Sequence, residues 1–205
     1  MDGKKSHWEN VYETKPADSV SWFQPHADQS LKIIESSGLG KKVSLIDVGG
    51  GASTLVDDLL DRGYDDVSVL DLSASALKVA QTRLGTKADK VKWLVGDITS
   101  IELPANAYDI WHDRAVFHFL TDEKDRHAYV EQVMRSVRPN GLVIVATFAE
   151  DGPEKCSGLP VMRYNAETLH HEFGDEFELL GKEKEVHHTP FGTDQQFIYC
   201  YCRKP

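Results

Sequence analysis

A run of three glycines is the part of this sequence best suited to holding a ligand. Gly49, Gly50 and Gly51 directly follow the apolar residues 43–48 and precede the segment LVDDLL. Without Cβ atoms, the backbone at such a turn can bend tightly and approach a ligand closely. The pattern is typical of a dinucleotide or nucleoside site, although a plain strand-to-helix turn has the same composition.

Three acidic residues strengthen this interpretation. Asp47, Asp71 and Asp97 each stand at or near the end of an expected strand. Asp71 follows Asp47 by 24 residues (71 − 47), where a carboxylate accepts both hydroxyl groups of a ribose. Each acid alone is commonly a helix cap or a solvated loop residue. Because the carboxyl ends of parallel strands meet at one edge, all three are expected to face one crevice.

A further polar group follows the fourth expected strand in the segment HDRAVFHFL. His112, Asp113 and Arg114 stand at the sheet edge where ligands bind in such folds. Asp113 and Arg114 are candidates for contact with a substrate, and an internal ion pair at the strand end is an equally good explanation. His118 has the position of a core histidine more than that of a base.

The elements that must position these residues are read from hydrophobic periodicity. From residue 42 onward, runs rich in Val, Ile and Leu alternate with amphipathic segments, as in sheets built from strand-helix units. The tail carries two further strands joined by the loop TPFGT, so we expect the sheet to close with an antiparallel hairpin. The prediction is a Rossmann-like, doubly wound α/β sheet of seven strands. The expected strands are residues 43–48, 67–72, 91–97, 108–113, 141–148, 176–188 and 194–204.

The 205 residues are expected to form one domain, with residues 1–40 as a helical lid segment and residues 41–205 as the core. A helix is predicted over about residues 25–37, ahead of Gly38. The aromatic residues that precede it have no core periodicity. They are therefore expected either to fold over the site as a lid or to pack the first helix onto the sheet.

Composition excludes several classes of partner. Lys plus Arg total 23 against 33 Asp plus Glu, a net charge of −10, so nucleic acid is an unsuitable partner. No apolar run approaches the ~20 residues of a membrane helix, and MDGKKSHWEN lacks the apolar centre of a signal peptide. These features predict a cytoplasmic protein. Three cysteines argue against a disulfide framework, and no histidine spacing suits a metal site.

The motifs decide between two nucleoside cofactors. A nicotinamide enzyme carries G-x-G-x-x-G, whereas Thr54 occupies the third position here. The strings IDVGGGAS, VLDLS, VGDI, YDIWHDR and RPNG resemble the successive motifs of class I S-adenosylmethionine-dependent methyltransferases. The resemblance covers about residues 42–203, and Ser53 replaces the last glycine of the family pattern. SWFQP, WHDRAVFHFLTD and HHTPFGTDQQF look most like small bacterial methyltransferases related to thiol or sulfide methylating enzymes, and more distantly like a citrate synthase lysine methyltransferase.

The resemblance implies a role for each matching residue. Asp47 and the backbone of Gly49–Gly51 resemble the floor under the methionine part, and Asp71 resembles the ribose acid. Leu72 and Ile98 would enclose the adenine, and Asp97 would accept a hydrogen bond from its amino group. His112 stands where the family's fourth strand passes the methionine part. Trp22 resembles a tryptophan that the thiol enzymes place against the cofactor, and Tyr12 would contact the cofactor carboxylate. The product would be S-adenosylhomocysteine.

Methyl transfer needs little machinery, because well-oriented reactants gain an effective concentration worth ~7–11 kcal/mol. A thiol is partly ionised already, whereas an amine or alcohol acceptor needs a base. Asp113, Arg114 and His188 are therefore the catalytic candidates, with at most one of His187 and His188 facing the site. A small thiol or sulfide is the favoured acceptor. The alternative acceptor is a protein lysine. The alternative functions are S-adenosylmethionine binding without turnover and a nicotinamide-dependent oxidoreductase.

Overall fold

The computed structural model describes residues 2–205, with side chains from Gly3 onward. Its main sheet has seven strands in the order β3-β2-β1-β4-β5-β9-β8. All neighbours are parallel except β5-β9 and β9-β8, which are antiparallel. The predicted α/β sheet with a C-terminal antiparallel hairpin is confirmed. The strands are β1 (Ser44–Val48), β2 (Asp66–Asp71), β3 (Val91–Val95), β4 (Tyr108–Arg114), β5 (Val137–Phe148), β8 (Glu178–His188) and β9 (Asp194–Arg203).

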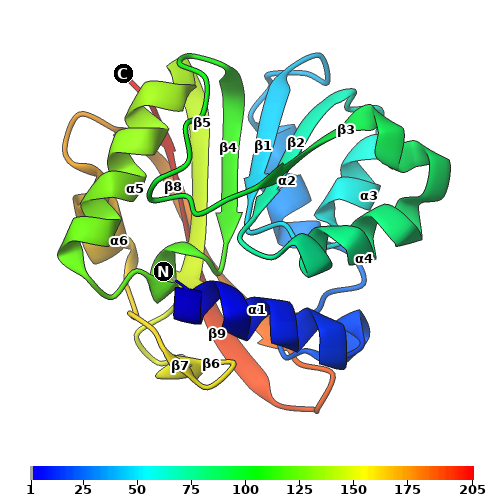
Figure 1. The fold of residues 1–205 in the computed structure, drawn as a ribbon. Coiled ribbons are helices and arrows are strands. Elements are labelled where there is room, and N and C mark those ends of the chain that lie inside the picture. Colours follow the sequence, from blue (N-terminus) through cyan, green and yellow to red (C-terminus); the bar gives the residue numbers. More distant parts are fainter. Residues whose placement is uncertain (1) are drawn as a thin grey trace.

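Helices cover both faces of this sheet (Figure 1). Successive side chains of a strand point to opposite faces, so Leu45 and Ile46 of β1 belong to two different cores. Both are fully buried, which explains why β1 reads as a continuous apolar run. One core contains side chains of α2 (Asp28–Ser36), α3 (Leu55–Asp61) and α4 (Ala74–Leu84). The other contains side chains of α5 (Glu123–Ser136) and α6 (Ala166–Phe173).

Side-chain caps determine where two helices begin. Ser73 Oγ accepts a hydrogen bond from Ala76 N at 3.0 Å at the start of α4. Asn165 and Thr168 form a capping box at the start of α6. At the start of α5, the side chain of Asp122 accepts a hydrogen bond from Lys124 N.

The N-terminal segment contains a helix that the sequence pattern did not predict. Helix α1 (Asp2–Thr14) lies across the carboxyl ends of the central strands, beside the small hairpin β6 (Lys155–Cys156) and β7 (Leu159–Pro160) (Figure 1). Its apolar stripe consists of Trp8, Val11 and Tyr12, which is too short to register as helical periodicity. The 3₁₀ turns η1 (Ala17–Ser19), η2 (Gly85–Lys90) and η3 (Phe117–Phe119) complete the described elements.

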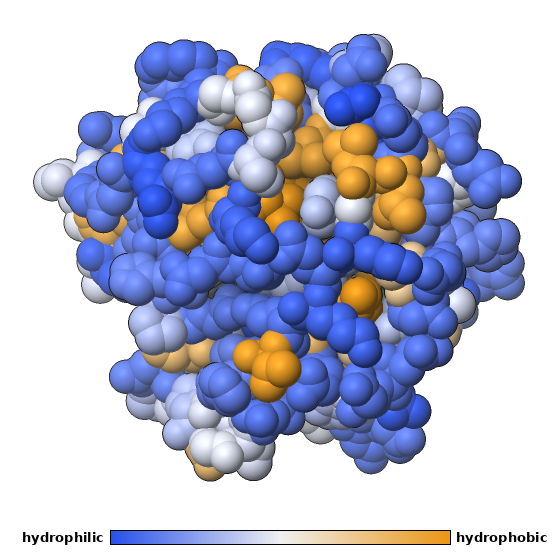
Figure 2. Space-filling view, turned by 180° about the vertical axis from the view of Figure 1, so that it is seen from behind, coloured by the Kyte–Doolittle hydropathy of each residue, from blue (hydrophilic) through white to orange (hydrophobic). Residues whose placement is uncertain are grey.

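The outer surface seen from behind is mostly hydrophilic, with an apolar patch in its upper half (Figure 2). Over residues 2–205, no helix is both long enough and apolar enough to cross a membrane.

Candidate functional site

The carboxyl ends of β1 to β4 form one wall of a cavity, and α1 contributes another. Of the predicted residues, this first cavity is lined by Tyr12, Trp22, Gly49, Asp71, Leu72, Asp97, Ile98 and Arg114. A second cavity is lined by Asp47, Gly50 and His112, and it shares Tyr12, Trp22, Gly49 and Arg114 with the first. The two cavities are therefore neighbours. They bring together every predicted cofactor-binding residue except Gly51, which lies behind the wall.

The glycine turn is shaped by its own surroundings. Gly49 has a φ of +71°, and a Cβ atom there would overlap the side chain of Val116. A Cβ at Gly50 would overlap the carboxylate of Asp47, and a Cβ at Gly51 would lie 2.5 Å from Asp71 Oδ2. The carboxylates of Asp47 and Asp71 thus lie so close to this turn that Gly50 and Gly51 are required even without a ligand.

Asp71 is a buried carboxylate at the end of β2 that faces the first cavity. Its side chain accepts a hydrogen bond from Ser73 N at 2.8 Å, and the residue is only 9% exposed. Burial raises the pKa of Asp71 to about 7, because the charged form loses its hydration. Further donors from a ligand would stabilise the carboxylate. A buried carboxylate that faces the cavity suits a ligand with hydroxyl groups, whose hydrogen bonds would add to the backbone ones from Ser73 and Gly51.

Asp97 closes the same wall one strand further on. Its Oδ1 accepts hydrogen bonds from Thr99 N at 2.9 Å and from Thr99 Oγ1 at 2.7 Å. These bonds use one carboxylate oxygen and fix the side chain beside Ile98 in the cavity wall. The other oxygen makes no hydrogen bond within the described residues.

Asp47 and His112 face each other across β1 and β4. The two residues are register partners, and Asp47 Oδ1 lies 2.7 Å from His112 Nδ1. The other ring nitrogen, Nε2, lies 2.8 Å from Ser30 Oγ. Asp47 Oδ2 is buried and has no hydrogen-bond partner among the described residues. A carboxylate oxygen of this kind suits an ammonium or hydroxyl donor.

Arg114 lies where the two cavities meet. Its Nε donates to Tyr199 Oη at 3.1 Å, and its Nη2 lies 3.3 Å from Glu185 Oε2. The guanidinium carbon stands 4.2 Å from the centre of the Phe197 ring. Nη1 makes the longest of these contacts, at 3.4 Å from the carbonyl oxygen of Trp22. Of the three nitrogens, Nη1 is therefore the one best placed to bind another acceptor. Arg114 is thus a buried cation at a ligand-accessible position.

Asp113 points away from both cavities, which corrects its expected contact with substrate. The residue is fully buried, and neither cavity includes it in its lining. Its carboxylate accepts hydrogen bonds from Val116 N at 2.9 Å and from Tyr129 Oη at 2.7 Å, and further from Phe117 N. These bonds hold the turn in which Ala115 has a φ of +73°. The ion pair with Arg114 that was the competing explanation does not form either.

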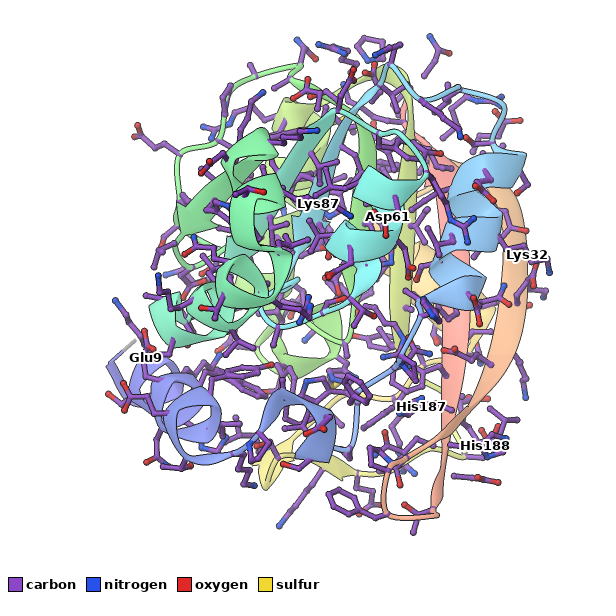
Figure 3. The ribbon with its side chains drawn as sticks, turned by 90° about the vertical axis from the view of Figure 1, so that its right-hand side faces the viewer. Glu9, Lys32, Asp61, Lys87, His187 and His188 are labelled. Carbon is purple, nitrogen blue, oxygen red and sulfur yellow. The ribbon has the colours of Figure 1, made fainter. Side chains whose placement is uncertain are left out.

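His188 is also misplaced for direct action at the site. Its side chain is 77% exposed and pairs with Asp194 at 2.6 Å on the outer side of β8 (Figure 3). His187 is the neighbour that turns inward, where its Nε2 donates to Ser21 O at 2.7 Å. Burial lowers the pKa of His187, which favours the neutral ring. Side chains alternate along the strand, so only one of the two histidines can face inward. That residue is His187, whereas His188 was the predicted catalytic candidate.

An aromatic cluster closes the first cavity from the N-terminal side. The rings of Trp8 and Trp22 are 5.6 Å apart, and Trp8 is 5.2 Å from Phe119. Trp22 Nε1 donates to Tyr12 Oη at 3.2 Å. Trp8 and Phe119 were not predicted as site residues. The helical i, i+4 spacing of Trp8 and Tyr12 was the available signal, although the aromatic residues of this segment were judged to lack core periodicity.

The sequence also resembles known proteins. Residues 45–141 match a family model described as a methyltransferase domain. The mouse eEF1A lysine and N-terminal methyltransferase is 24% identical over 143 residues, which are 69% of this chain and 20% of that protein. This chain thus spans about a fifth of that relative's length. An uncharacterized methyltransferase of Mycobacterium bovis is 31% identical over 104 residues, or 51% of this chain and 50% of that protein.

A solved structure extends the likeness to nearly the whole chain. The protein studied for conversion of a disulfide bond into a thioacetal group in echinomycin biosynthesis superimposes with a TM-score of 0.77. The match covers 98% of this chain and 92% of that one, at 18% identity. At this identity the likeness shows the fold alone, which is the Rossmann-like α/β fold expected from the sequence.

Proposed function

We propose that this chain, an S-adenosylmethionine-dependent methyltransferase with the class I fold, transfers the methyl group to a small acceptor, and that the acceptor is a thiol or sulfide. The observation that carries the acceptor proposal is Arg114, a buried cation at the junction of the two cavities. The cofactor would leave S-adenosylhomocysteine after transfer.

The first cavity is proposed to hold the adenosine part of the cofactor. Asp71 would accept the ribose hydroxyls, and its raised pKa is supporting evidence because ligand donors would relieve the desolvated carboxylate. Leu72 and Ile98 would contact the two sides of the adenine ring, and the free oxygen of Asp97 would accept its amino group. The donor set therefore fits a purine nucleoside.

The second cavity is proposed to hold the methionine part. Asp47 Oδ2, which is buried and unpaired among the described residues, would accept the ammonium group. His112 would hold the Asp47 carboxylate in this orientation, because its two ring nitrogens are already engaged by Asp47 and Ser30. Tyr12 and Trp22 would close this cavity where it joins the first.

Residues 1 to about 24 are proposed to act as a lid, with α1 as its moving part. Lys4, Trp8 and Tyr12 of α1 line the first cavity, so a cofactor in that cavity would be shielded from water by this helix. Because α1 is joined to the core through an irregular segment, it can open without unfolding the sheet. Lid opening would then precede product release.

The chain's contribution to transfer is orientation and electrostatics. An acceptor sulfur lone pair would form the new bond to the methyl carbon while the bond from that carbon to the cofactor sulfur breaks, in line. Arg114 would stabilise the thiolate before attack, because a nearby cation lowers a thiol pKa. Cys156 lines the same cavity, where burial raises the pKa of its thiol to about 12 although Arg114 opposes the effect. Burial thus outweighs the effect of Arg114 on Cys156, so an acceptor thiol would need direct contact with the Arg114 guanidinium to bind as a thiolate.

A protein lysine is the second candidate, and two observations favour it. The mouse relative is named as a lysine methyltransferase, and the charge of −10 would attract a basic protein surface. A lysine ammonium, however, calls for carboxylates near the methyl group. Of the carboxylates that line the first cavity, Asp71 and Asp97 belong to the proposed cofactor site, and Asp125 pairs with Lys4 at 3.4 Å. Cofactor binding without turnover is a third outcome.

The test is a competition assay with S-adenosylmethionine labelled in its methyl group. Sulfide, a panel of small thiols and a lysate are supplied together, and labelled products are identified by mass spectrometry. We expect label on sulfur, with a rate that follows the thiolate fraction from about pH 6 to about pH 9. Label only on protein lysine would support the second candidate. Cofactor binding with no labelled product would support the third.

A further inference from the structure

A glutamate of α1 caps a helix to which it does not belong. Glu9 Oε1 accepts a hydrogen bond from Ala74 N at 2.9 Å, and Oε2 accepts one from Ser75 N at 3.0 Å. Oε2 also accepts from Ser73 Oγ at 2.9 Å. The first N–H groups of a helix have no partner within it, and they favour a negative charge. Glu9 thereby joins α1 to the start of α4.

The capped turn is continuous with the proposed ribose site. Ser73 N donates to Asp71 Oδ1 at 2.8 Å, and Ser73 Oγ donates to Glu9. One residue thus contacts both the acid that faces the first cavity and the carboxylate that belongs to the lid. Movement of α1 away from α4 would remove a partner from Ser73 and loosen the turn that orients Asp71.

We propose that Glu9 is a positioning residue that latches α1 over the cofactor and couples lid closure to the orientation of Asp71. The ligand's identity rests on the function proposed above. Glu9 touches neither cavity, so its effect on binding passes through Ser73 and through the position of α1.

Besides its aromatic cluster, α1 makes three other charged or polar contacts, and each is weaker than this latch. Lys4 Nζ lies 3.4 Å from Asp125 Oδ2 in an exposed ion pair, and such pairs contribute little. His7 Nε2 lies 3.1 Å from Ser157 Oγ. Glu13 accepts one hydrogen bond, from Ser75 Oγ at 3.3 Å. Glu9 alone among these residues accepts from two backbone N–H groups and a hydroxyl.

The ionisation of Glu9 agrees with this role. Partial burial would raise its pKa, but the hydrogen bonds from Ser75, Ala74 and Ser73 outweigh that effect and lower the pKa to about 2. The Glu9 carboxylate is therefore charged near neutral pH. When α1 is closed, this negative charge lies at the N-terminus of α4.

Glu13 offers a matched control, because Glu13→Gln removes the same charge from the same helix face. The experiment compares Glu9→Gln, Glu13→Gln and the unchanged protein. S-adenosylhomocysteine is the probe, and its dissociation rate is followed by tryptophan fluorescence, since Trp8 and Trp22 line the cavity. Hydrogen exchange of residues 2–14 and the melting temperature are measured without the probe.

We expect Glu9→Gln to accelerate dissociation of the probe by roughly tenfold, as for lost charge-assisted hydrogen bonds. Exchange in α1 should also rise, while Glu13→Gln stays within about twofold of the unchanged protein on both measures. Equal behaviour of the two variants would overturn the proposal. Faster exchange without faster dissociation would overturn it too, because Glu9 would then be only a helix cap. If the unchanged protein binds no probe, the proposed function fails, and a Glu9→Gln exchange pattern equal to that of Glu13→Gln would then dismiss the latch as well.

Discussion

Arg114 on β4 and Glu185 on β8 form an ion pair of 3.3 Å, with side chains only 10% and 14% exposed. Gln24 Nε2 donates to the other oxygen of Glu185 at 2.7 Å. The pair therefore ties the N-terminal segment, the central sheet and the C-terminal hairpin together at the junction of the two cavities. Glu185 also accepts a hydrogen bond from Tyr199 Oη at 3.2 Å, so three side chains share its carboxylate.

Arg114→Gln should lower kcat/KM for a small thiol by roughly 10- to 100-fold, the effect of losing a buried charged donor. The slope of rate against pH should steepen, because the thiolate loses its cation. Steady-state kinetics with sulfide from about pH 6 to about pH 9 checks this. Arg62→Gln, at an exposed ion pair with Glu35, serves as the control and should change nothing. Equal kinetics for both variants would remove Arg114 from the acceptor site.

Asp71→Ala should leave the fold intact and weaken cofactor binding by about 1.5–3 kcal/mol, the contribution of a charge-assisted pair. Calorimetry with S-adenosylhomocysteine measures the change. Asp66→Ala, at the exposed start of the same strand, is the control. An unchanged dissociation constant for Asp71→Ala would take this residue out of the site.

Cofactor binding should release protons near neutral pH. The pKa of Asp71 in the free protein is raised to about 7, so the carboxyl is partly protonated there, and ribose donors would lower that pKa. Affinity should therefore rise as pH increases through about 7 and level off above about 8. Calorimetry in two buffers of different ionisation enthalpy counts the released protons. Asp71→Asn should abolish the release, and its persistence in that variant would assign it to another group.

The raised pKa of Asp71 also predicts how the stability of the free protein changes with pH. A carboxyl whose folded pKa exceeds its unfolded value favours the folded state when protonated, so its contribution is present below about pH 4 and is lost as pH rises to about 7. The melting temperature of the free protein at about pH 8 should therefore be raised by Asp71→Asn relative to the unchanged protein. At about pH 4 the two should melt alike. The opposite ordering would show that the carboxylate is well solvated.

Deletion of residues 1–14 should remove the lid without unfolding the core. The contacts of Gln24 and Trp22 with the hairpin side of the site remain, and the two cores do not include α1. Thermal unfolding should stay cooperative, while turnover falls and bound S-adenosylhomocysteine becomes accessible to an iodide quencher. Full activity in the shortened protein would mean that the aromatic residues of α1 serve packing alone.

Ala115→Gly should stabilise the protein slightly. Ala115 has a φ of +73°, a conformation that costs an L residue about 1–2 kcal/mol, and glycine adopts it freely. Glycine also gives the unfolded chain more conformational entropy, which offsets about 0.4–1 kcal/mol of this gain in stability. A rise of a few degrees in melting temperature is therefore expected. Differential scanning calorimetry measures it, with Ala105→Gly in the exposed turn before β4 as a control. A lower melting temperature would mean that the Ala115 methyl group packs favourably in the cavity wall.

Much of the wall of the two cavities was predictable because its signals are local. Alternating apolar runs determine strands, and Gly49–Gly51 with Asp47, Asp71 and Asp97 stand at strand ends whatever surrounds them. Since parallel strands end at one edge, their order along the chain already implies a shared cavity. The antiparallel hairpin followed from two runs with a short loop. These parts needed no knowledge of distant contacts.

The direction of individual side chains was decided only by tertiary structure. Asp113 and Arg114 are adjacent, yet one is buried against Tyr129 and the other lines the cavities, because alternation fixes opposite faces without saying which face is which. Pairing of β8 with β9 made the same choice between His187 and His188. The sequence by itself determined the sheet, the glycine turn and the acids at its edge. Which neighbours turn inward, and that α1 closes the cavity through Glu9, depend on contacts between segments far apart in the chain.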